Sequence, residues 1–75
     1  MANLKLLDAM AAGRLLSKQE VAHILNLHPV SLMRLVRAGD FPKPIRFGDK
    51  VGCVLRFDPA EVQTWLESRK QARAA

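Results

Sequence analysis

The chain has 75 residues, 49% of them hydrophobic, which excludes a disordered chain and leaves no room for a second hydrophobic core. Twelve Lys and Arg residues against seven Asp and Glu residues give a formal net charge of +5 and a pI near 10.2. This balance favours a polyanionic partner, most simply nucleic acid, with a soluble domain of merely basic surface as the alternative.

The first predicted element is a short helix over residues 2–12 that ends at Gly13. Its apolar residues fall mainly on one side, which carries Leu4, Leu7 and Ala11, with Leu6 and Met10 beside them. A helix this short is not stable alone, so it must pack on the domain or on a partner, or else fray. The sequence does not choose among these three outcomes.

A second helix begins at Ser17, because Ser17-Lys18-Gln19-Glu20 has the pattern of a capping box. Its inner face consists of Val21, Ala22 and Leu25. Asn26 follows where the chain must turn, and asparagine tolerates the left-handed conformation better than most residues. We expect Leu27 to lie in the core.

The next helix begins at His28-Pro29, since proline at the first helical position loses no hydrogen bond. Leu32, Leu35 and Val36 form its buried stripe. Gly39 is suited to end it, with Arg37 in the last turn. The segment 41–44, with two prolines, then forces extended geometry.

Two short β-runs, 45–47 and 53–57, flank a glycine-bounded loop and predict a hairpin. Asp58-Pro59 opens the last helix, whose apolar face carries Val62, Trp65 and Leu66. The order of elements predicts a small, mainly helical α+β protein: a winged helix-turn-helix with a two-stranded β-hairpin wing, a C-terminal helix and an N-terminal helical extension. We place the extension at 1–13, the winged helix-turn-helix domain at 14–70 and a basic tail at 71–75.

A helix-turn-helix inserts its second helix into the DNA major groove. The candidate residues of this recognition helix are His28, Pro29, Val30, Ser31, Met33, Arg34 and Arg37. Among them we expect Arg34 to read guanine, Ser31 to donate to a base or phosphate, and Val30 or Met33 to touch a thymine methyl. Arg37 is expected at a phosphate. The alternative for both arginines is a solvated face.

The wing is expected to follow the DNA backbone or the minor groove through Arg46 and Lys50, with Arg56 on the return strand. Further backbone contacts are expected from Ser17, Lys18 and Lys43.

Other chemistry is not supported by the residues. His23 and His28 do not share a helical face and have no cysteine near them, which argues against a zinc site. Cys53 and Trp65 are expected in the core. No carboxylate pair and no glycine-rich phosphate loop is present, so we expect neither an enzyme nor a cofactor, metal or small-molecule substrate. One cysteine, no long apolar run and a poor secretory signal indicate a cytoplasmic protein without membrane contact.

Residues 14–70 resemble the AlpA-type phage regulator and excisionase group, which is related to the MerR-like winged helix-turn-helix domain. The resemblance rests on Gly39-Asp40-Phe41-Pro42-Lys43-Pro44, on Ile45-Arg46 and Gly48 behind it, and on the spacing of Asp58, Glu61, Val62 and Trp65. It implies a bacterial mobile-element protein that binds double-stranded DNA. Pro29 and Met33 depart from the residues common in the group, which suggests a different target sequence.

An excisionase of this kind binds repeated sites cooperatively with further copies of itself, bends DNA and directs a tyrosine integrase towards excision. A transcription regulator of the same fold is the alternative that the resemblance leaves open. A third reading is a protein-interaction module that uses residues 1–12 and the last helix as its contact surface.

Overall fold

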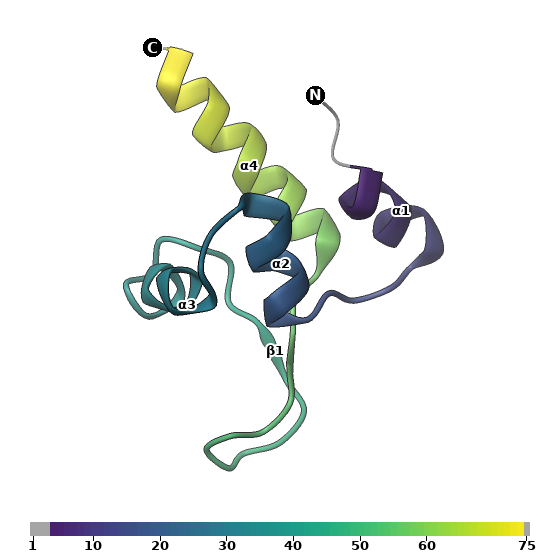
Figure 1. Ribbon diagram of the computed structural model, residues 1–75, viewed down its shortest axis with the longest axis vertical. Coiled ribbons are helices and arrows are strands. Elements are labelled where there is room, and N and C mark those ends of the chain that lie inside the picture. Colours follow the sequence, from purple (N-terminus) through teal and green to yellow (C-terminus); the bar gives the residue numbers. More distant parts are fainter. Residues whose placement is uncertain (1–3, 75) are drawn as a thin grey trace.

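The computed structural model describes residues 4–74, which form four helices and one β-hairpin. In chain order these elements are α1 (Leu4–Ala12), α2 (Lys18–Leu25), α3 (Pro29–Arg37), β1 (Ile45–Arg46), β2 (Leu55–Arg56) and α4 (Pro59–Ala74). The predicted mainly helical winged helix-turn-helix is confirmed. α1 and α3 lie on opposite sides of α2 and α4, and the hairpin reaches away at the end opposite the C-terminus (Figure 1). Residues 1–3 of the expected extension, residue 75 of the expected tail and the side chain of Leu4 lie outside the described part.

α1 forms where the sequence predicts it, and Gly13 follows it with a φ of +69°. The buried side of α1 is not the side on which the sequence gathers Leu7 and Ala11. Leu6 and Ala9 are fully buried, while Leu7, Met10 and Ala11 are exposed. A segment rich in Leu and Ala offers more than one apolar face, and the contact between α1 and α4 selects the one with Leu6 and Ala9. Of the three outcomes left open, α1 packs on the domain.

α2 begins with the predicted capping box. The Ser17 hydroxyl accepts from the Glu20 N–H at 3.1 Å, and Glu20 Oε1 accepts from the Ser17 N–H at 2.9 Å. Asn26 ends the helix in the expected left-handed conformation, with φ 54° and ψ 44°. The prediction for Leu27 is wrong, since its side chain is 36% exposed. Its backbone N–H donates to the Ala22 carbonyl at 2.8 Å, so Leu27 closes the turn through its backbone.

α3 has Pro29 in its first turn, and the His28 Nδ1 caps it by accepting from the Val30 N–H at 3.1 Å. Leu32 is fully buried and anchors the predicted stripe, with Leu35 and Val36 partly buried beside it. Gly39 adopts a φ of +79°. The N–H groups of residues 39 and 40 donate to the carbonyls of residues 36 and 35, which completes the helix end.

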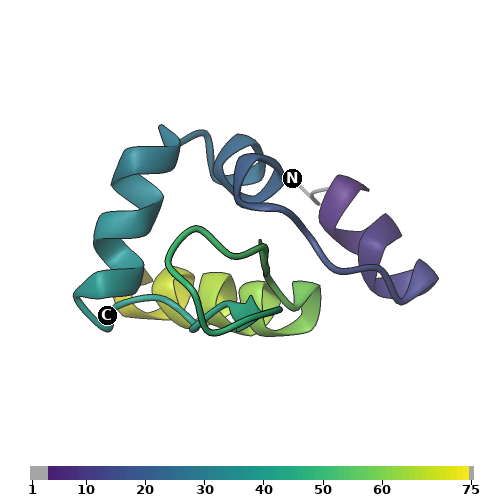
Figure 2. The same cartoon turned by 90° about the horizontal axis from the view of Figure 1, so that it is seen from below.

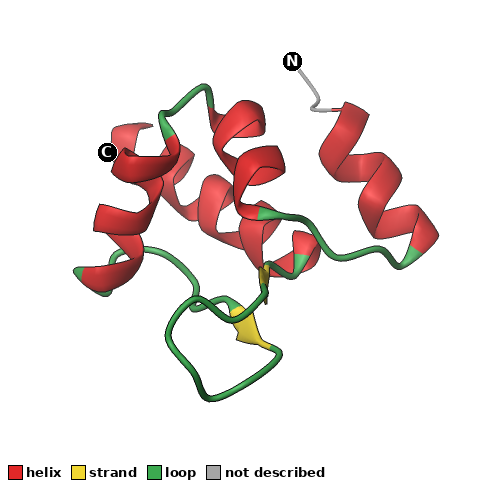
Figure 3. Cartoon of the chain, turned by 60° about the horizontal axis from the view of Figure 1, so that its bottom comes forward, coloured by secondary structure: helices red, strands yellow, loops and turns green. Residues whose placement is uncertain are grey.

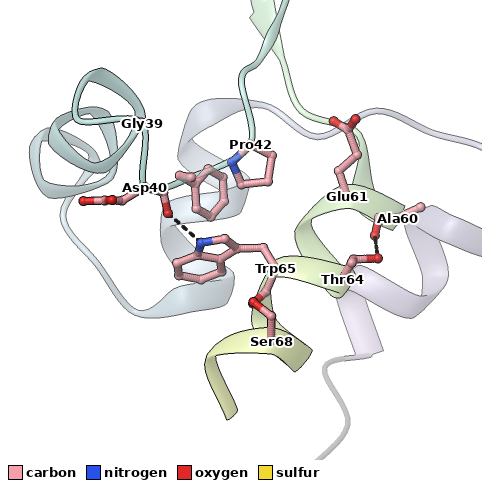
Figure 4. A pocket seen from close by; sticks show the side chains of 9 residues that line it. Gly39, Asp40, Pro42, Ala60, Glu61, Thr64, Trp65 and Ser68 are labelled. Atoms are coloured by element: carbon pink, nitrogen blue, oxygen red, sulfur yellow. Dashed lines mark hydrogen bonds between the residues drawn. The ribbon is translucent and has the colours of Figure 1, made fainter. Parts of the chain in front are cut away.

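The segment after α3 is fixed to α4 by aromatic contacts. Phe41 is buried, with its ring centroid 5.7 Å from that of Phe57 and 4.6 Å from that of Trp65. The Trp65 indole Nε1–H donates to the Asp40 carbonyl at 2.6 Å (Figure 4). Trp65 therefore packs against the core as expected, and it sets where the chain leaves α3 for the hairpin.

The hairpin is antiparallel, with Ile45 opposite Arg56 and Arg46 opposite Leu55. Its strands are shorter than predicted, and most of the wing is loop (Figure 3). The expectation that Cys53 lies on a strand and in the core is wrong, because it lies in the loop and is partly exposed. Ile45 and Phe47 are both exposed. The two-stranded sheet has no partner layer over these residues that would bury them.

A backbone pairing outside β1 and β2 joins the end of the hairpin to the start of α2. The Leu16 N–H donates to the Phe57 carbonyl at 2.9 Å, and the Phe57 N–H donates to the Leu16 carbonyl at 2.7 Å. Both side chains are buried. This pairing brings the base of the wing beside the first turn of α2.

The described residues share one core, to which all four helices contribute. It consists of Leu6, Ala9, Leu16, Val21, Ala22, Leu32, Phe41, Phe57 and Val62. α1 is thus part of the same packed body as the helix-turn-helix.

Candidate nucleic-acid interface

The exposed side of α3 is a ridge of three residues at helical spacing: Val30, Arg34 and Arg37. It lies opposite the buried stripe centred on Leu32, so the packing that holds the helix also turns these side chains outward. Val30 is 52% exposed. We call these three residues the α3 ridge.

The other candidates of the recognition helix lie at its start and flanks. His28 is exposed, and its Nδ1 is used by the cap. Pro29 and Ser31 are half-buried. Met33 is half-buried as well and faces the wing rather than the ridge, since it lines the hollow between the two.

A groove of about 550 Å³ lies between α3 and the hairpin. Seen from below, the hairpin loop lies beside α3 (Figure 2). Four cations from three parts of the fold line the groove: Lys18 from α2, Arg37 from α3, and Arg46 and Arg56 from the hairpin. Its remaining lining residues carry no charge and are Gln19, Met33, Val51, Gly52, Cys53 and Leu55. We call this hollow the cationic groove.

The wing cations are held in different ways. The Arg46 guanidinium donates to the Lys50 carbonyl at 3.4 Å across the loop, and Arg56 Nη1 donates to the Leu55 carbonyl at 2.7 Å. Lys50 is exposed on that loop. Lys43 is exposed on the segment between α3 and β1, away from the residues that line the groove.

Acidic partners are scarce around these cations. Within residues 4–74 the only ion pair joins Arg14 to Asp8 at 3.1 Å, and neither residue lines the groove. The Glu20 carboxylate lies in the first turn of α2 but bonds to the cap at Ser17. The Ser17 backbone N–H that donates to it lowers the pKa of Glu20, while desolvation by burial opposes this shift. Glu20 thus stays ionised and bound to the cap.

A second hollow, of about 620 Å³, lies between α4 and the segment after α3. Trp65, Pro42 and Thr64 line it together with the acidic Asp40 and Glu61 (Figure 4). Its lining contains no Lys or Arg, so it is unsuited to a phosphate. Of these two hollows, the cationic groove is the one whose charge suits nucleic acid.

Residues 4–74 contain no cluster of three or more His, Cys, Asp or Glu side chains that could ligate a metal ion. None of the helices in that range combines the length and apolar character that a membrane span requires.

The sequence indicates the individual cations but not that they line one groove. The approach of Lys18 to Arg56 depends on the Leu16–Phe57 pairing, for which the sequence carries no local signal. Gln19 and Gly52 were not singled out, although both line the groove.

Residues 15–70 match the model of a family described as "Helix-turn-helix domain". No curated protein and no solved structure matches the chain. The matched range contains α2, α3, the hairpin and most of α4, and so all the cations of the ridge and groove. Since this range is well over half of the chain, the chain belongs to the helix-turn-helix domain family, and its fold is that of a DNA-binding protein.

Proposed function

We propose that the chain is a sequence-specific, non-catalytic DNA-binding protein of a mobile genetic element that acts as an excisionase. The observation that carries the proposal is the exposed α3 ridge beside the cationic groove and the wing. A helix of this kind enters the major groove, while cations around it meet the phosphate backbone.

In this proposal Arg34 reads the bases. It is exposed in the middle of the ridge, and an arginine there reaches guanine O6 and N7. Val30, on the same ridge one turn earlier, is placed for a thymine methyl. Ser31 at the flank donates to a base or a phosphate.

The remaining cations are assigned to the backbone. Arg37, Arg46 and Arg56 share the cationic groove with Lys18, which supports phosphate contacts for all four. Lys50 on the wing loop, Lys43 before β1 and the Ser17 hydroxyl complete the proposed set.

Cooperative binding to DNA is expected because the domain is small. One small DNA-binding module buries only about 600–1,000 Å² and reads few base pairs, too few for high specificity. We therefore assign side-by-side association on repeated sites, with bending of the DNA between them. Two surfaces are open to a neighbouring copy: the exposed face of α1, with Leu7 and Met10, and the basic tail, with Arg73.

The excisionase role rests on the resemblance of the Gly39–Pro44 run and the last helix to the AlpA-type excisionase group. Its test is an excision assay with the integrase of the same element and a plasmid that carries both attachment ends. Recombination towards excision that requires this chain supports the proposal. Binding that leaves excision unchanged but alters transcription from the adjacent promoter assigns the regulator role instead. No specific binding to element-end duplex contradicts both.

A further inference from the structure

The cationic groove gathers positive charge from parts of the chain that are far apart in sequence. Lys18, Arg37, Arg46 and Arg56 line one hollow, and no acidic side chain is among its lining residues. Within the described residues none of these four cations forms an ion pair. Like charges around one hollow repel each other, and an anion between them removes that repulsion.

The surroundings strengthen the case for an anion. Lys18 and Gln19 stand in the first turn of α2, where backbone N–H groups have no partner inside the helix and the helix dipole favours negative charge. The Glu20 carboxylate of the same turn is bound to Ser17 and does not line the groove. The half-buried apolar lining from Met33 and Leu55 lowers the local dielectric constant, which raises the energy of every charge pair in the groove.

The hairpin on one side of the groove is weakly held. Its strands pair over two residues each, and a two-stranded hairpin of this size is marginal by itself. Its base is fixed by the Leu16–Phe57 pairing, but the loop residues 47–52 are exposed. An anion in the groove would join α2, α3 and both strands at once, and so hold the loop end of the wing against α3.

We propose that the cationic groove is a phosphate-binding site that takes phosphodiester groups of the DNA backbone, whatever the base sequence, and that its occupancy docks the wing on α3. Only the source of the phosphate rests on the proposed DNA-binding function. The groove itself binds the phosphoryl group as a ligand, so a small inorganic oligophosphate is also expected to occupy it.

The reactivity of the Cys53 thiol reports whether the groove is occupied. It is the only cysteine of the chain, it is partly exposed and it lines the groove, so a docked anion and wing shield its thiol. The full chain is treated with the uncharged reagent 4,4′-dithiodipyridine, with and without inorganic pyrophosphate at constant ionic strength. If the occupied state is protected, the rate of thiol modification falls by about tenfold when pyrophosphate reaches ten times its Kd.

Matched variants show whether the protection is local. Arg37→Gln removes a groove cation whose side chain makes no hydrogen bond or ion pair within residues 4–74, and Arg69→Gln removes an equal charge from an exposed position on α4. We expect the protection to be lost in Arg37→Gln and kept in Arg69→Gln, with unchanged circular dichroism in both. Equal protection in the two variants, or no protection of the wild-type chain by pyrophosphate, overturns the site.

A second experiment tests whether the DNA backbone supplies the phosphate that the groove binds. Random-sequence duplex DNA is expected to protect Cys53 in the wild-type chain and less in Arg37→Gln. If fluorescence anisotropy shows that the duplex binds while Cys53 stays reactive, the groove does not take the backbone and the inference fails, although the DNA-binding function stands. If no duplex binds at all, the proposed function fails, and the pyrophosphate arm still decides the site.

Discussion

The Trp65 indole donates a hydrogen bond to the backbone carbonyl of Asp40 at 2.6 Å, which ties α4 to the point where the chain leaves α3. The same indole ring packs edge-on against Phe41. One side chain of the last helix therefore supports the end of the recognition helix and the approach to the wing.

Replacing Trp65 tests this link. Trp65→Phe keeps an aromatic ring against Phe41 but removes the hydrogen bond, and we expect it to lower the free energy of unfolding by about 1–2 kcal/mol. Trp65→Ala also removes the packing and should cost about 3–5 kcal/mol. Urea denaturation followed by circular dichroism measures both. Equal losses for the two variants would show that the hydrogen bond, and not the ring, carries the stability.

Gly39 ends α3 with a φ of +79°, and a Cβ built there meets no atom within 4 Å. Gly39→Ala should therefore cost only the backbone penalty of a left-handed alanine, about 1–2 kcal/mol. Asparagine tolerates this conformation better, so Gly39→Asn should lose less. Thermal melts of the three proteins give the comparison, and an alanine variant as stable as the wild type would contradict it.

The capping box at Ser17 predicts a loss of stability in acid. Because the pKa of Glu20 is lowered in the folded state from its ordinary value of 4.5, the unfolded chain takes up the proton first as the pH falls. The contribution of Glu20 is complete above about pH 4.5 and is lost as the pH falls through its lower folded-state pKa. Glu20→Gln retains an oxygen that accepts from the Ser17 N–H but cannot titrate. Its Tm should fall less steeply than that of the wild type below about pH 4.5, and parallel curves would rule out this role of Glu20.

Replacing Arg34 and replacing Lys50 should have different effects on DNA binding. Arg34→Ala is expected to weaken specific binding by about 1–3 kcal/mol and to relax the preference at one base pair. Lys50→Ala should weaken binding to all duplexes about equally. Arg69→Ala, on the far half of α4, serves as the charge-matched control. Anisotropy titrations with the specific site and with single-base variants measure these effects. A loss from Lys50→Ala confined to the specific site would mean that the wing reads sequence.

The slope of the DNA-binding constant against salt concentration measures how many phosphates the protein contacts. The five cations assigned to phosphates on the groove and wing loop are Lys18, Arg37, Arg46, Lys50 and Arg56. Five contacts predict a slope of log K against log salt of about −4 to −5 on duplex DNA, and Arg37→Gln should reduce its magnitude by about 1. A flat slope would contradict DNA binding of this kind.

The fold was predictable because its signals are local. Ser17, Asn26, Pro29 and Gly39 each act within one turn of the chain, and each marks a helix end where expected. The burial of α1 was not predictable, because Leu6 and Leu7 are chemically alike and only the contact with α4 separates them.

The site was predictable in composition but not in arrangement. The periodicity of α3 places Arg34 and Arg37 opposite Leu32, so their exposure follows from the sequence. The convergence of Lys18 with Arg46 and Arg56 depends on a single backbone pairing between residues 41 positions apart, which no propensity encodes. Cys53 was misplaced for a related reason, since the two strands pair over only two residues each and leave Cys53 in the partly exposed loop.

The pairing of Leu16 with Phe57 makes α2, α3 and the hairpin a segment whose two ends meet. The chain enters and leaves this segment at adjacent backbone positions, each fixed by the other. A fusion partner or tag added before α1 or after α4 is attached outside it. A pulling force that enters along the backbone before α2 is therefore resisted by these two hydrogen bonds before it reaches Arg34, whereas a force on α4 also reaches the end of α3 through the contact of Trp65 with Asp40.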